Sequence, residues 1–279
     1  MAEIGGQAVV EGVMMRSPSM FAVAVRDEKG RIVVKKEKLD SVASRLRFFR
    51  LPFFRGMLAL YESLALGFKA LFWSAGAASD EQDKFSKKDF FIAVFFALFF
   101  AVAMFIIIPF YLTAFLTKEN SFLFNLVDGL IRIAFFVAYI AAISLMKDVR
   151  VMFQYHGAEH KAVNAFEAGE ELSVMNVRKH STVHMRCGTS FLIIVFIIAV
   201  FVFSVVPSDD WAVRILSRVV LLPVIVGASY EFLKLSSRFR KFGVVRLLFL
   251  PGLLLQGMTT KEPDDRQLEV SIAALKALL

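Results

Sequence analysis

Four long apolar blocks constrain this chain more than any other feature of its sequence. They cover residues 90–116, 122–146, 189–206 and 212–235. Because about 20 consecutive apolar residues can cross a bilayer as a helix, each block could be a transmembrane span. Hydrophobic residues make up 57% of the chain, which exceeds the roughly 45–50% usual for soluble domains. The sequence therefore predicts a mostly α membrane protein with about four transmembrane helices, in contact with a lipid bilayer.

Charged residues inside apolar blocks are functional candidates by default, because burying a charge in lipid is costly. Asp128 and Arg132 have an i, i+4 spacing, so we expect them to pair with each other on one helix. Glu231 could have either of two roles. It either faces the histidine-rich segment described below, as a further ligand or proton acceptor, or it pairs with Lys234 or Arg238 near the membrane surface.

The distribution of Lys and Arg predicts the orientation of the spans. Residues 1–89 hold fifteen of them and residues 147–188 hold six, whereas the connection at 118–121 has a single lysine. The positive-inside rule then places both termini and segment 147–188 in the cytoplasm, as in a multi-pass protein of the cytoplasmic membrane.

The chain has a net charge of +8. Because excess Lys and Arg in a membrane protein usually mark its cytoplasmic face, we do not expect a nucleic-acid partner. Two arginines in the last block, Arg214 and Arg218, would lie toward its outer end. We expect them to pair with acidic residues there: Asp128, Asp209 or Asp210.

Residues 1–43 are predicted to form a small β-rich region in the cytoplasm. The runs at 22–25 and 32–34 flank a turn sequence that contains Gly30, which can adopt positive φ. Glu11 stands in a preceding apolar, glycine-containing run at 5–16. It is either a functional carboxylate or the solvent-facing side chain of an ordinary strand.

Three further segments are expected to lie outside the spans. Residues 44–89 interleave Arg and Phe before an apolar stretch, which favours a basic interfacial or re-entrant helix followed by a linker. Residues 244–257 are apolar but short and are interrupted by Pro251 and Gly252, so an interfacial or re-entrant segment is expected. The tail 263–279 predicts an amphipathic helix capped by Asp264 or Asp265, with one apolar stripe: Leu268, Ile272, Leu275 and Leu279.

These boundaries define the expected order of regions along the chain. It is a β-rich region at 1–43, a basic helix and linker at 44–89, a first helix pair at 90–146, a His/Cys loop at 147–188, a second helix pair at 189–235, and an interfacial segment with the amphipathic helix at 236–279.

All four histidines and the one cysteine fall between residues 156 and 187. His156 and His160 flank Glu159 at an i, i+4 spacing, which presents two imidazole nitrogens on one helix face. The order His-x-x-Glu-His is also the reversed zincin motif, in which the glutamate acts as general base on a metal-bound water. The spacing recurs, with a thiol one turn later, in a second group: His180, His184 and Cys187.

Imidazole and thiolate are common ligands of transition metals, so the segment predicts a divalent metal site, with zinc the first choice. A closed structural site would use four side chains, whereas a catalytic site would use three and leave a position for water. Glu159 inside the first motif favours the catalytic case. The alternative is that the histidines make ordinary hydrogen bonds and that Cys187 is a small apolar residue at a helix start.

The runs Gly5–Arg16 and His156–Lys161 resemble those of a bacterial domain-of-unknown-function family. Its members are labelled YqhQ-like and described as predicted metal-dependent enzymes. The resemblance extends over nearly the whole chain, including the stretch from His180 through Gly188. It implies an integral protein of the bacterial cytoplasmic membrane, and it brings no substrate with it.

The leading functional hypothesis is a metal-dependent hydrolase at the cytoplasmic membrane interface, acting on a peptide or lipid-linked substrate that arrives from the bilayer. The alternative is a non-enzymatic factor for the assembly or biogenesis of other membrane proteins, in which the histidine cluster is structural. A transport path along Asp128, Arg132 and Glu231 would require a homo-oligomer, because four spans offer few buried polar groups.

Overall fold

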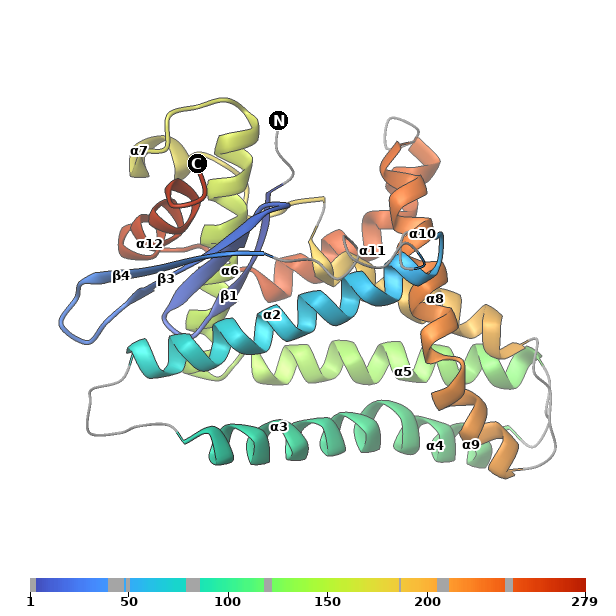
Figure 1. Ribbon diagram of the computed structural model, residues 1–279. Coiled ribbons are helices and arrows are strands. Elements are labelled where there is room, and N and C mark those ends of the chain that lie inside the picture. Colours follow the sequence, from blue (N-terminus) through green and yellow to red (C-terminus); the bar gives the residue numbers. More distant parts are fainter. Residues whose placement is uncertain are drawn as a thin grey trace.

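The computed structural model describes residues 4–39, 48, 51–78, 86–117, 122–185, 187–204, 211–238 and 243–279. Within these residues the protein is mostly helical, with one small antiparallel sheet near the N-terminus. The expected partners Asp209 and Asp210 lie outside the described residues, as do the side chains of Arg214 and Arg238. Figure 1 shows the sheet in one group with α6 (Lys147–Glu167), α7 (Val174–Val177) and α12 (Asp265–Lys276), beside the apolar helices.

The sheet has the strand order β1-β2-β3-β4, and each neighbouring pair is antiparallel. The predicted hairpin is confirmed as β3 and β4, and Gly30 in its turn has a φ of +79°. Glu11 does not lie in a strand. It occupies the β1–β2 turn with a φ of +48°, and its carboxylate accepts a hydrogen bond from the Tyr155 hydroxyl at 3.3 Å. The strands span Gly5–Val9, Gly12–Arg16, Met20–Arg26 and Ile32–Lys38.

Helices cover both faces of the sheet, which explains why β2 and β3 are continuous apolar runs rather than alternating ones. On one face, Met15 and Ala24 are fully buried in a cluster that includes residues of α6 and α12. On the opposite face, Met14 and Val23 pack against Leu66 of helix α2 (Phe54–Ala78). The sheet is therefore the middle layer of a three-layer region.

The predicted amphipathic tail is confirmed as α12. The Asp264 carboxylate accepts from the Gln267 N–H at 2.8 Å, and the Gln267 side chain accepts from the Asp264 N–H at 2.9 Å. This reciprocal pair is a capping box. Of the predicted stripe, Leu279 is exposed and three residues are buried against the sheet and α6: Leu268, Ile272 and Leu275.

Two of the four predicted spans are present as helices long and apolar enough to cross a membrane. The first is one continuous helix made of α3 (Lys87–Val102), a π-helical turn η2 (Ala103–Ile107) and α4 (Ile108–Leu116). The second, α5 (Phe122–Ile143), packs beside it (Figure 1). In the most apolar 18-residue window of the first helix, no residue is buried by the described protein.

The other two predicted spans differ from expectation. Helix α8 (Gly188–Ser204) has 17 described residues, at the short end of the lengths that cross a bilayer. Block 212–235 is not one helix, because α9 (Trp211–Val220) ends before α10 (Leu222–Arg238) begins. Pro223 lies at this junction, and its ring has no N–H to continue the hydrogen-bond ladder of the preceding helix. Four uninterrupted spans are therefore not confirmed.

The predicted interruption at Pro251 was wrong. Residues 244–257 belong to one helix, α11 (Gly243–Thr259), which continues through Pro251. Close packing supports this helix, since a Cβ on Gly252 would lie 2.8 Å from the Cα of Ser190 in α8. The His/Cys loop at 147–188 begins with the long helix α6, in agreement with the i, i+4 spacing of His156 and His160. Its run of alanines, Lys and Glu without proline favours a helix over a loop.

The buried charges of the apolar helices pair largely as predicted. Arg132 Nε lies 3.1 Å from one carboxylate oxygen of Asp128, in the expected i, i+4 pair. Arg218, from α9, lies 3.4 Å from the other oxygen and donates to the Asn125 side chain at 2.9 Å. The Asp128 carboxylate therefore lies between two guanidiniums, and all three side chains are almost fully buried.

We expect Asp128→Ala to lower the free energy of unfolding by about 3–5 kcal/mol, because the buried Arg132 would lose the carboxylate with which it pairs. Denaturation of the detergent-purified protein measures this change. Asp148→Ala is the matched control, since Asp148 is an exposed residue in the first turn of α6. Equal stability of the two variants would contradict the proposed role of the buried carboxylate.

Candidate metal centre

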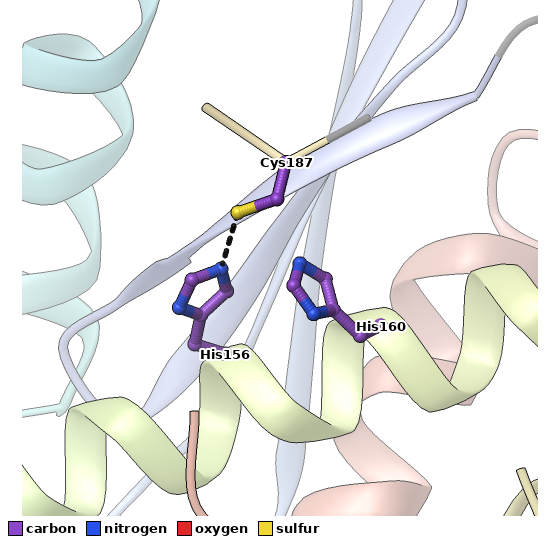
Figure 2. A group of neighbouring side chains, drawn as sticks. All are labelled: His156, His160 and Cys187. Atoms are coloured by element: carbon purple, nitrogen blue, oxygen red, sulfur yellow. Dashed lines mark hydrogen bonds between the residues drawn. The ribbon is translucent and has the colours of Figure 1, made fainter. Parts of the chain in front are cut away.

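Helix α6 places His156 and His160 on one face, as their spacing predicts. Their ring centroids lie 4.5 Å apart. Cys187 comes from the residues immediately before α8, and its Sγ lies 3.3 Å from His156 Nε2. Figure 2 shows the thiol directed toward the two imidazoles of the helix. One ligand atom from each of the three residues lies within 4.8 Å of the others.

These separations fit a metal ion. Zinc bonds nitrogen at about 2.0–2.1 Å and sulfur at about 2.3 Å, so tetrahedral ligands lie roughly 3.3–3.8 Å apart. Small movements of the three side chains would bring them to such distances. Two imidazoles and a thiolate are also a donor set suited to zinc.

Backbone carbonyls fix the orientation of both imidazoles. His156 Nδ1 lies 2.9 Å from the carbonyl oxygen of Thr259, and His160 Nδ1 lies 2.5 Å from that of Thr182. A carbonyl can only accept, so each Nδ1 carries the proton and each Nε2 keeps its lone pair. Outer-shell acceptors of this kind orient histidine ligands in metalloproteins.

Burial keeps His160 neutral. Desolvation, aided by the neighbouring His156, lowers the pKa of His160 to about 3. Burial likewise raises the pKa of the Cys187 thiol, and a coordinating cation would remove that proton. The site therefore presents a neutral His160 imidazole and a thiol that becomes a ligand only when it loses its proton.

Glu159 lies at the edge of this group. Its carboxylate is 3.4 Å from His160 Nε2, and the residue is only 4% exposed. Its Cγ would lie 2.9 Å from a Cβ built on Gly6 of β1, so the glutamate packs directly on that strand. Burial raises the pKa of Glu159 to about 7, against the opposing effect of His156. A carboxylate with this pKa is suited to accepting and returning a proton.

The second group of predicted ligands is only partly brought together with the first. His184 lies nearby, with its ring 5.8 Å from that of His160, but its Nε2 is 3.5 Å from the Glu167 carboxylate. His180 Nε2 lies 3.2 Å from Glu170. Residues 178–185 form turns and bends rather than a helix, so the spacing of His180 and His184 does not place them on one helix face.

The two acidic candidates outside the motif lie elsewhere. Glu11 is held by Tyr155, as described above. Glu231 accepts hydrogen bonds from the Phe53 N–H at 3.0 Å and from Arg55, with which it forms an ion pair at the start of α2. The interpretation of Glu231 as an ion-paired carboxylate is therefore favoured, with Arg55, which the sequence did not suggest, as a partner.

A cavity of about 830 Å³ opens onto the three ligand residues and Glu159. Its walls come from β1, the end of β2, α2, α6 and the start of α8. The apolar side chains in these walls include Met14, Leu66, Met152, Phe153 and Leu192. The candidate metal centre thus lies in a space large enough for a substrate.

Helix α11 organises the site, which the sequence analysis did not anticipate. The Gln256 side chain accepts from the His184 N–H at 2.9 Å and donates to the His184 carbonyl at 3.0 Å. It thereby holds the chain just before Cys187. The signal was available, because Gln256 is a single amide within an apolar run and such residues are functional candidates. The carbonyls of Thr182 and Thr259 carry no comparable sequence signal.

Gly157, between the two ligands, permits a close crossing of two segments. The residues after α11 pass over α6, where the Lys261 N–H donates to the Phe153 carbonyl at 2.9 Å. A Cβ on Gly157 would lie 2.1 Å from the Lys261 carbonyl oxygen. Only glycine fits at this position without displacing the crossing segment.

We expect Gly157→Ala to destabilise the protein by about 1–3 kcal/mol through overpacking. Gly76→Ala in α2 is the control, because no atom of the described residues lies within 4 Å of its added Cβ. Alanine is the better helix former, so the control should be neutral or more stable by up to about 1 kcal/mol. Thermal denaturation in detergent measures both, and a stabilised Gly157→Ala protein would rule out the tight crossing.

We expect the purified protein to hold about one equivalent of zinc, the amount a single site binds. His156→Ala and Cys187→Ala should each lose most of it, because each removes a ligand from the converged group. His180→Ala is the control and should retain the metal. Elemental mass spectrometry after purification without chelators measures the content. Equal metal loss in all three variants would show that the ligand set is different.

Comparison with known proteins gives a consistent picture of relatedness. A family described as "Protein of unknown function (DUF1385)" matches residues 51–279. The uncharacterized protein YqhQ of Bacillus subtilis (strain 168) is 35% identical over 301 aligned positions, which cover 99% of this chain and 92% of that protein. No solved structure matches the chain significantly.

Proposed function

The chain belongs to the DUF1385 family of proteins of unknown function, and we propose that it is a metal-dependent hydrolase that acts at a membrane interface. One observation carries this proposal. Three ligand atoms converge beside a buried carboxylate, and the same residues line a large cavity. Three protein ligands with space for water are typical of a catalytic rather than a structural zinc site.

A zinc ion bound by His156, His160 and Cys187 would supply Lewis acidity to a water molecule and to a substrate carbonyl. Glu159 would accept one proton from a water molecule whose oxygen attacks the carbonyl carbon of the substrate. The same carboxyl group returns the proton to the leaving atom as the scissile bond breaks. Its pKa of about 7 suits both steps near neutral pH.

We further propose that the protein is a multi-pass component of the cytoplasmic membrane with both termini on the cytoplasmic side. The two span-length apolar helices support membrane insertion. The apolar helix α8 begins one residue after Cys187, so the candidate metal centre would lie close to the bilayer surface. The excess of Lys and Arg in segments 1–89 and 147–188 supports the orientation.

We expect Glu159→Gln to retain zinc and lose hydrolysis by about 10²–10⁴-fold, the usual contribution of a general base. The amide has the same shape but cannot accept the proton. A mixture of quenched fluorescent peptides, cleaved by the detergent-purified protein, measures the rate. Glu170→Gln, which alters the partner of His180, is the matched control and should cleave normally.

The same variants distinguish the proposed hydrolase from the second candidate function, which is an assembly factor with a structural metal. In that case Glu159→Gln would keep every measurable property, and removal of His156 or Cys187 would unfold the segment around the site. Loss of activity with metal and thermal midpoint unchanged would exclude it.

A further inference from the structure

Strand β1 is an edge of the sheet, and it lies against the cavity. The strand order leaves β1 with a single neighbour, β2, among the described strands. Four consecutive residues, 5–8, line the same cavity as His156, His160 and Cys187. Gly6 is exposed. Helices α6 and α2 cover the two faces of the sheet here, so the cavity opens onto its edge.

The hydrogen-bond register determines which main-chain groups of β1 point outward. The Arg26 N–H donates to the Glu11 carbonyl at 2.9 Å, so odd-numbered residues of β2 bond to β3. Hydrogen-bonding directions alternate along a strand, so even-numbered residues of β2 bond to β1. Their partners in β1 are Gly5, Gln7 and Val9.

The main-chain groups of Gly6 and Ala8 therefore point away from the sheet, toward the cavity. The position of Glu159 agrees, because the Gly6 N–H faces its carboxylate. A strand edge with outward N–H and C=O groups can pair with another extended chain. Here that edge adjoins the three ligand atoms.

We propose that β1 binds an extended segment of polypeptide as an added strand, which brings a main-chain carbonyl of that segment to the candidate metal centre. This inference rests on the proposed hydrolase function and names its substrate class. Peptides bind sheet edges through main-chain hydrogen bonds, and pockets accept their alternate side chains. The apolar walls from Met14, Leu66 and Leu192 suit apolar side chains, whereas a lipid chain could not pair with the main-chain groups of Ala8.

The test uses a fluorescein-labelled pentapeptide of alternating valine and alanine and its fully N-methylated counterpart. Both have the same side chains, but only the first can pair as a strand. Fluorescence anisotropy with the full-length protein in detergent measures the two affinities without added metal. We expect the unmethylated peptide to bind at least about tenfold more tightly, as the loss of two or more main-chain hydrogen bonds would predict. Equal affinities, or no binding, would overturn the inference.

Ala8→Pro removes an outward N–H from the protein side and should abolish the tenfold preference. Proline is tolerated at such edge positions. Lys36→Pro in β4 is the matched control, because Lys36 is exposed and its N–H points outward from the opposite edge. It should keep the preference. Thermal midpoints of both variants establish that they fold. The methylated peptide tests strand pairing independently, because it removes the same hydrogen bonds while the protein stays wild type.

A peptide hydroxamate and decyl hydroxamate, compared with zinc added, separate this inference from the proposed function. If the unmethylated pentapeptide binds more tightly than its methylated counterpart, but added zinc changes the affinity of neither hydroxamate, the proposed hydrolase function is refuted and the strand site is supported. Zinc-dependent binding of decyl hydroxamate that Ala8→Pro does not alter, together with equal affinities of the two pentapeptides, would refute the strand site and indicate a lipid-like substrate.

Discussion

The backbone contact between α6 and the segment that follows α11 is the constraint on which the rest of the site depends. The Lys261 N–H reaches the Phe153 carbonyl because Gly157 has no side chain. The same crossing puts the Thr259 carbonyl 2.9 Å from His156 Nδ1, and so sets the tautomer of a candidate ligand. It also leads the chain into α12, which buries one face of the sheet. The backbone contact at Gly157 thus positions both helix α12 on the sheet and the His156 side chain in the candidate metal centre.

A second constraint acts among the apolar helices. Pro109 has no N–H, so the Phe105 carbonyl in η2 lacks its usual helical donor. Arg132 donates to that carbonyl at 3.0 Å while it pairs with Asp128. A carbonyl without a donor is costly in an apolar setting, so the buried cation offsets two penalties at once. The Arg132 guanidinium interacts with neighbouring groups of the same helix bundle, which favours a structural role over a role in a transport path.

The sequence predicted much of this architecture, because the signals were local. Turn chemistry at Gly30, the capping residue Asp264 and the spacing of His156 and His160 each act within a few residues. The errors occurred where tertiary packing decides. Pro251 would ordinarily end a helix, but α11 is supported by its packing against α8. His180 and His184 have helical spacing without a helix. Convergence of Cys187 with the first histidine pair depends on Gln256 and Thr259, which are distant in sequence.

The surroundings of the three ligand residues favour chemistry over a purely structural metal. A structural site gains most from complete coordination and exclusion of water, yet here the ligands line an open cavity. A buried carboxylate beside them is costly unless it has a use, because burial raises its pKa toward neutrality. The adjoining edge of β1 directs the main-chain groups of Gly6 and Ala8 toward the same cavity, and a folded protein would normally cover such an edge. An extended peptide bound next to Glu159 would make use of all three features.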